Sequence, residues 1–133
     1  MICSSTDYSA IIGGNNNKIA SYSADADYSA IIGGECNYNC ASQGSVILGG
    51  CYNRLYFYSY CSVIAAGVCN CLDGCSERSV ISGGCNNCMN YSIDSGIMGG
   101  HFNTICDGSK STIIGGNGAY IGNAERSSII GGH

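Results

Sequence analysis

The chain has 133 residues, enough for one compact domain and no more. Nine acidic against five basic side chains leave no basic footprint for nucleic acid and no polybasic patch for a membrane surface. No apolar run approaches the length of roughly 18 residues that a membrane span requires. Twenty-one glycines and no proline indicate a backbone that turns often and needs its N–H groups for pairing.

One motif, Ser-x-Ile-x-Gly-Gly, recurs eight times, with alanine once in place of the first glycine. The second glycines are Gly14, Gly34, Gly50, Gly67, Gly84, Gly100, Gly116 and Gly132. The isoleucines are Ile11, Ile31, Ile47, Ile64, Ile81, Ile97, Ile113 and Ile129. The serines are Ser9, Ser29, Ser45, Ser62, Ser79, Ser95, Ser111 and Ser127. After one long first spacing, the copies follow one another every 16 or 17 residues, so the whole chain is a tandem array.

A second pattern follows each glycine pair. Its first column is Asn17, Asn37, Asn53, Asn70, Asn87 and Asn103. Two residues later stand Ile19, Leu55, Leu72, Met89, Ile105 and Ile121. Asn39 and Ala119 are the exceptions to these columns. The spacing of two and the glycines between the halves predict two short strands per repeat joined by tight turns, because no helix could propagate through such frequent glycine pairs.

We therefore expect an all-β chain in which each unit of 16–17 residues forms one coil of a β-solenoid. Residues 1–133 would form a single repeat domain of about seven to eight coils, a rod on the order of 34 Å long if coils stack at the strand spacing. A hexapeptide helix fits less well, because it needs a period of about 18 residues and an aliphatic residue at every sixth position.

The two strands of a unit differ in their outward residues. In the first strand the neighbours of the isoleucine are also largely apolar, as at Ala10 and Ile12 or Val46 and Leu48. In the second strand the outward column is mixed: Lys18, Tyr38, Arg54, Cys71, Cys88, Thr104 and Tyr120. A coil two strands thick covers only one face of its first strand, so the pattern predicts that another subunit covers the other face.

The units resemble the head repeats of YadA-like trimeric autotransporter adhesins and the similar Ser-x-Ile-Ile-Gly-Gly-x-x-Asn repeats of phage and giant-virus fibre proteins. The residues that carry the resemblance are Ser-Ala-Ile-Ile-Gly-Gly at 9–14 with Asn17, and Ser-Ser-Ile-Ile-Gly-Gly at 127–132. The resemblance implies a left-handed parallel β-roll, a homotrimer and an adhesive or receptor-binding spike. The cysteine content departs from autotransporter heads and favours a viral or phage fibre.

The asparagine column has two interpretations. Stacked inward amides can form a ladder that bonds from coil to coil and to the turn backbone, or the column can form a ligand site. We favour the ladder. The glycine pairs are expected to supply positive φ and close backbone approach, with no phosphate-binding role.

Eleven cysteines occupy many columns of the repeat. Cys85-x-x-Cys88 superficially suggests zinc, but a strand places neighbouring residues on opposite faces, and histidine occurs only at 101 and 133. Free thiols acting as small apolar or turn residues are the favoured interpretation. Cys71 and Cys88 share a column on adjacent coils, so a disulfide between coils remains an alternative.

No catalytic constellation is visible, so we predict no enzyme activity and no cofactor or metal. Asp25 and Asp27 fall in the one long spacing and lack a third acidic ligand or a partner histidine, which favours a solvated loop. His101 has no nucleophile beside it in the pattern and is expected in an exposed turn.

Aromatic residues are concentrated in the third unit, which predicts a contact patch of Tyr52, Tyr56, Phe57, Tyr58 and Tyr60. The alternative is that these rings brace neighbouring coils or subunits. The expected function is a structural and adhesive segment of an extracellular, virion-surface or cell-surface fibre that binds a cell-surface protein or glycan. A purely structural shaft without a receptor is the alternative. The chain starts and stops part-way round a coil, so we expect end-to-end continuation into further coils or a stalk.

Overall fold

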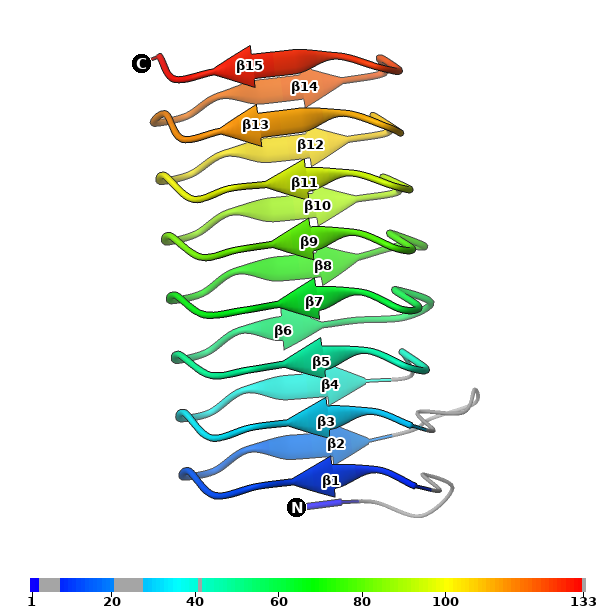
Figure 1. Ribbon diagram of the computed structural model, residues 1–133, viewed down its shortest axis with the longest axis vertical. Coiled ribbons are helices and arrows are strands. Elements are labelled where there is room, and N and C mark those ends of the chain that lie inside the picture. The colour runs from blue at the N-terminus through cyan, green and yellow to red at the C-terminus, as the bar shows by residue number, and fades with distance from the viewer. Residues whose placement is uncertain (3–7, 21–27, 41, 133) are drawn as a thin grey trace.

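The computed structural model describes residues 1–2, 8–20, 28–40 and 42–132. These residues form short parallel strands that stack into two sheets, seen one behind the other in Figure 1. The prediction of an all-β solenoid with two strands per repeat is confirmed. Among the residues that the structure describes, no helix has the length and apolar character needed to cross a bilayer.

The strands of each sheet are two or three residues long and follow one another in chain order. The eight-stranded sheet contains β1 (Ala10–Ile11), β3 (Ala30–Ile31), β5 (Val46–Ile47), β7 (Val63–Ile64), β9 (Val80–Ile81), β11 (Gly96–Ile97), β13 (Thr112–Ile114) and β15 (Ser128–Ile130). The seven-stranded sheet contains β2 (Lys18–Ala20), β4 (Tyr38–Cys40), β6 (Arg54–Leu55), β8 (Cys71–Asp73), β10 (Cys88–Asn90), β12 (Thr104–Cys106) and β14 (Tyr120–Gly122).

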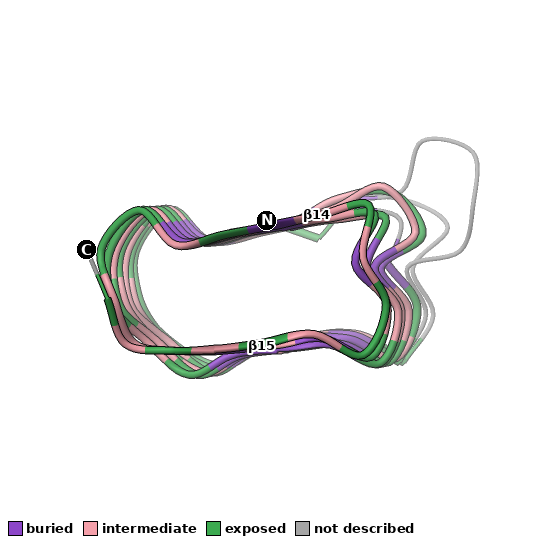
Figure 2. Cartoon of the chain, turned by 90° about the horizontal axis from the view of Figure 1, so that it is seen from above, coloured by how far each residue is buried: buried purple, intermediate pink, exposed green. Residues whose placement is uncertain are grey.

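Register is kept from coil to coil. Ile64 pairs with Ile81 in one sheet, and Leu72 pairs with Met89 in the other, so each sequence column becomes a straight row along the rod. Viewed along the rod in Figure 2, a coil is flat, with the two sheets as facing walls and a turn at each end. At the N-terminus, Ile2 forms a parallel bridge with Ile19 and so joins the column of the seven-stranded sheet.

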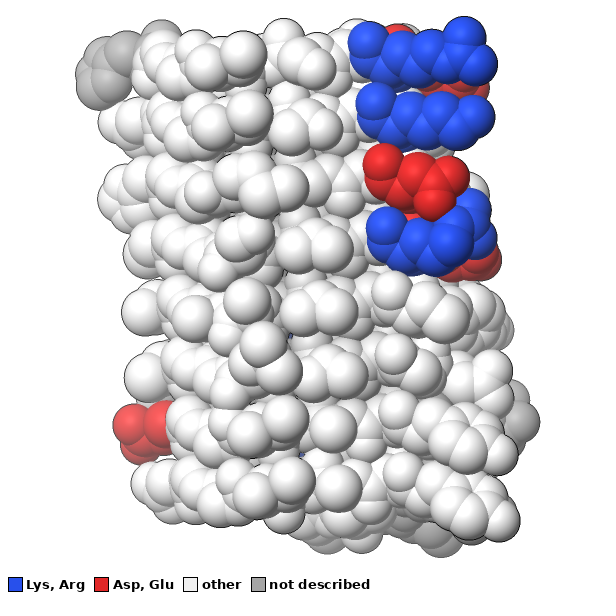
Figure 3. Space-filling model, in the orientation of Figure 1, with Lys and Arg blue, Asp and Glu red and all other residues white. Residues whose placement is uncertain are grey.

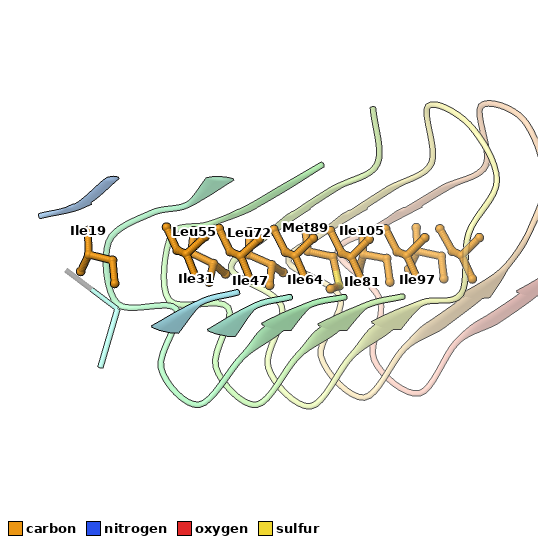
Figure 4. Packing of buried hydrophobic residues seen from close by; sticks show 12 residues of the cluster. Ile19, Ile31, Ile47, Leu55, Ile64, Leu72, Ile81, Met89, Ile97 and Ile105 are labelled. Atoms are coloured by element: carbon orange, nitrogen blue, oxygen red, sulfur yellow. The ribbon is translucent and has the colours of Figure 1, made fainter. Parts of the chain in front are cut away.

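The core is a double row of aliphatic side chains between the walls, one from each sheet per coil (Figure 4). From the eight-stranded sheet come Ile31, Ile47, Ile64, Ile81, Ile97 and Ile113. From the seven-stranded sheet come Ile19, Leu55, Leu72, Met89, Ile105 and Ile121. Each of these side chains is at most 4% exposed, so burial of the row supplies the main stabilisation of an otherwise thin structure.

Asn39 interrupts this row. It pairs in register with Ile19 and Leu55, and it is fully buried. Its Nδ2 donates to the Ser45 carbonyl oxygen at 3.2 Å, but its Oδ1 has no hydrogen-bond partner among the described residues. An orphaned buried oxygen of this kind costs about 1–3 kcal/mol, so the second unit is less stable at this point than its neighbours.

Candidate interaction surfaces

An asparagine ladder fixes the turn at the Gly-Gly end of each coil. The Oδ1 of each ladder asparagine accepts the backbone N–H at the same place one coil later: Asn87 N–H donates to Asn70 Oδ1 at 3.0 Å, and Ala119 N–H donates to Asn103 Oδ1 at 3.0 Å. The Nδ2 of Asn70 donates to Ala66 O and to Gly84 O, both at 3.1 Å. The amides thus bond from coil to coil and to turn carbonyls, and the column is engaged in backbone pairing.

The ladder explains the second glycine of each pair. Gly84 has φ +87°, a left-handed conformation that other residues rarely adopt. A Cβ at Gly84 would collide with the carbonyl oxygen of Gly100 on the next coil and would lie 2.5 Å from Nδ2 of Asn87. The glycine and asparagine columns therefore depend on each other.

Two serine columns hold the opposite turn. The hydroxyl of Ser62 donates to the Ser76 carbonyl at 2.8 Å and accepts the Ser79 N–H at 3.0 Å, so this hydroxyl bonds one coil to the next. The second column was not singled out by the sequence analysis: Ser42, Ser59, Ser76 and Ser92, all fully buried. The signal that could have found it is the recurrent Ser-x-x-Ser, as at Ser76 and Ser79.

The outward side of the eight-stranded sheet is an uncharged surface, which we call the apolar face. Its two columns of outward residues contain no charged side chain among the described residues. The exposed large members are Ile12, Ile32, Leu48, Met98, Ile114 and Ile130, each 43–79% exposed. Figure 3 looks onto this side, where charged residues gather only at the edges. A flat apolar strip of this kind marks a contact surface more often than a solvated one.

A charged edge borders the apolar face in the C-terminal half of the rod (Figure 3). Nε of Arg78 donates to Asp94 Oδ1 at 2.6 Å, and Nη2 of the same guanidinium donates to Asp94 Oδ2 at 3.2 Å. These hydrogen bonds hold the pKa of the Asp94 carboxyl below its usual range. Lys110 and Arg126 continue the same column, so Asp94 is the one acidic residue among three basic ones and the edge is basic toward β15.

In the N-terminal half, aromatic rings occupy this same column. The Tyr8 and Tyr28 rings stack with centroids 5.1 Å apart and planes 6° apart. The border of the apolar face therefore changes from aromatic to charged along the rod.

The predicted aromatic patch is divided. Tyr56 and Phe57 stack with centroids 6.3 Å apart, and Tyr58 meets Tyr60 edge to face at 5.9 Å. Tyr52 lies apart from these four, because it precedes β6, at the Gly-Gly turn, whereas the others follow β6 at the opposite turn. The predicted strand already separates Tyr52 from Tyr56, because the two ends of a strand lead to different turns.

Two residues outside the predicted patch extend it across coils. Tyr38, on β4, meets Tyr56 edge to face with centroids 5.8 Å apart. The Nζ of Lys18, one coil further, lies 5.4 Å from the centroid of the Tyr38 ring. Lys18 and Tyr38 stand in the same outward column of the repeat, and this column was the sequence signal for their contact. The outer face of the seven-stranded sheet therefore carries a cation and a run of rings.

Tyr52 has its own surroundings at the Gly-Gly turn. The neighbouring Cys36 side chain, through its electrostatic interaction and a hydrogen bond, and then the charge of Glu35 raise the pKa of the Tyr52 phenol. Tyr52 is 49% exposed, so its hydroxyl is open to solvent beside these groups.

No family model matches this chain, and no curated protein matches it. What the chain does therefore has to follow from its own surfaces. Across the described residues, no group of three or more histidine, cysteine or acidic side chains is arranged to hold a metal ion.

The remaining candidates are dispersed. The ten cysteines in the described part of the chain are free thiols, spread over both turns and the seven-stranded sheet. His101 is exposed and lies against the Phe102 ring, with centroids 4.4 Å apart. Asp25 and Asp27 lie outside the described residues.

Proposed function

We propose that this chain is a structural and adhesive segment of a surface fibre or spike. Three copies would pack through the apolar face as left-handed parallel β-rolls, on a virion, a cell surface or another extracellular structure. The observation that carries the proposal is the apolar face itself, where isoleucine, leucine and methionine side chains remain exposed along the rod. The resemblance to YadA-like heads and fibre repeats supports a trimer over other oligomers.

The energetics favour association through this surface. The inward isoleucines already fill the coil, so the outward apolar columns add nothing to the core of a single chain. Covering them stabilises an assembly by about 25 cal/mol for each Å² of apolar area removed from water. The uncharged centre adds no charge repulsion between copies, and the Arg78–Asp94 pair stays at the solvated border.

The oligomer is tested by the molecular mass in solution. At micromolar concentration we expect sedimentation equilibrium to give three times the 13.7 kDa chain mass. Leu48→Lys, which places a charge on the apolar face, should give a folded monomer. The matched control is Thr104→Lys, on the outer face of the seven-stranded sheet, which should remain trimeric. A folded wild-type chain that sediments as a monomer would overturn the assembly.

The display role is tested on the four clustered rings. We expect Ala at Tyr56, Tyr58 and Tyr60 together to abolish binding to a glycan or cell-surface target, with a melting temperature near that of the wild type, because aromatic contact residues contribute large rigid area at such sites. Glycan arrays and cell-binding assays measure the first effect, and circular dichroism measures the second. The control is Tyr52→Ala, at the other turn, which should keep binding.

Two outcomes contradict the display role. Loss of stability with unchanged binding would mean that the rings brace the coils. A wild-type chain that binds nothing across diverse glycans and cell surfaces would indicate a shaft without its own receptor.

A further inference from the structure

Two thiols meet at the middle of the seven-stranded sheet. Cys71 on β8 and Cys88 on β10 are direct partners in the parallel register. Both are half-buried, and both face outward, because the next residues, Leu72 and Met89, point into the core. Each thiol is the largest single influence on the pKa of the other.

The spacing of this pair suits a disulfide. Parallel neighbours in register have Cα atoms about 4.8 Å apart, within the range of about 4.4–6.8 Å found for bonded cysteines. Of the residues that the described strands and bridges place in register, Cys71 and Cys88 form the one cysteine pair. Their other neighbours in the column are Arg54 and Thr104, which cannot compete for either sulfur.

We propose that Cys71 and Cys88 are a redox modification site, at which a small-molecule disulfide such as oxidised glutathione converts the two thiols into a disulfide that links β8 to β10. The inference does not depend on the trimer, because both sulfurs belong to one chain.

The two sulfurs have different tasks. The neighbouring Cys71 thiol lowers the pKa of Cys88, whereas the neighbouring Cys88 sulfur and burial raise the pKa of Cys71. The Cys88 thiolate therefore attacks one sulfur of oxidised glutathione, forming a mixed disulfide and releasing one glutathione thiolate. Cys71 then loses its proton and attacks the Cys88 sulfur, which releases the second glutathione thiolate. Two thiols are oxidised, and one glutathione disulfide is reduced to two thiols.

The disulfide would link two central coils covalently. β8 and β10 are otherwise joined by three residue pairs of backbone register. A covalent link between them closes one complete coil and prevents these strands from separating when the rod is heated or pulled along its axis.

The experiment treats the purified folded chain with oxidised glutathione, blocks remaining thiols with N-ethylmaleimide and locates the linkages by peptide mass spectrometry. We expect the Cys71–Cys88 disulfide as the main product, with a melting temperature about 5–10 °C above that of the reduced chain. Cys69→Ser, at an exposed thiol on the adjoining turn, is the matched control and should form the same disulfide.

Single variants separate the steps. In Cys71→Ser the Cys88 sulfur should retain one glutathione, because the group that would displace it is gone. In Cys88→Ser, Cys71 should stay reduced. A lasting glutathione adduct at Cys88 of the wild type would overturn the proposal, and so would a main linkage from Cys88 to Cys106 or scattered linkages through the exposed Cys61 and Cys69.

Discussion

Replacing Ile81 with aspartate is expected to unfold the chain. Ile81, on β9, is fully buried and pairs in register with Ile64 and Ile97, which are fully buried as well. None of these neighbours can bond to a carboxylate, so the variant must bury an unpaired charge or open the coil. The expected loss is more than about 4 kcal/mol, a large part of the roughly 5–15 kcal/mol that holds a domain of ordinary stability.

Far-UV circular dichroism during urea titration measures this loss at a fixed protein concentration. The matched control is Thr104→Asp, one residue before the buried Ile105, because the Thr104 side chain lies on the outer face of the seven-stranded sheet and away from the apolar face. It should retain the strand signal and unfold near the wild-type urea concentration. An Ile81→Asp chain as stable as that control would contradict the assignment of the isoleucine row to the core.

Gly84→Ala is expected to produce the second largest effect. The added Cβ meets the Gly100 carbonyl oxygen and the Asn87 amide, and the residue must hold φ near +87°. Backbone strain and overpacking together give an expected loss of about 3–5 kcal/mol. Because the clash involves the backbone of the next coil, a change of side-chain rotamer cannot relieve it.

Gly83→Ala is the control, since it changes the neighbouring residue by the same single methyl group. Gly83 has no positive φ, and a Cβ built on it meets nothing within 4 Å. Thermal unfolding of both variants should show a large fall for Gly84→Ala and a nearly unchanged or slightly raised melting temperature for Gly83→Ala. Equal falls would show that the two positions are constrained alike.

The core could be predicted from the sequence because the inward residues recur at a regular spacing. Ile81 and Leu72 each recur in a column with a spacing set by the coil, and alternation alone decides which side chains point inward. The second serine column obeys the same rule, and the Ser-x-x-Ser spacing of Ser76 and Ser79 is the sequence signal for it. The coarse fold followed from these columns.

The surface was less predictable, because the turn backbone repeats from coil to coil but the side chains that it carries do not. Tyr52 has φ +56°, and Asn16 and Asn86 hold the same left-handed conformation at the same place in their coils. Those asparagines were the available signal, because asparagine adopts this conformation more readily than most residues do. The contact between Tyr38 and Tyr56 depends on side-chain rotamers across two coils, which composition cannot supply.

The asparagine ladder carries a consequence for how such a protein varies in length. Each ladder asparagine donates its backbone N–H to the previous coil, and its Oδ1 accepts the same bond from the next coil. The contacts of one coil are therefore the same wherever the coil stands in the array. Duplication or loss of one whole unit in the gene would leave every remaining bond with a valid partner. The rod can therefore be lengthened or shortened in steps of one coil, about 4.8 Å each, whereas a partial unit would place another residue where the second glycine must stand.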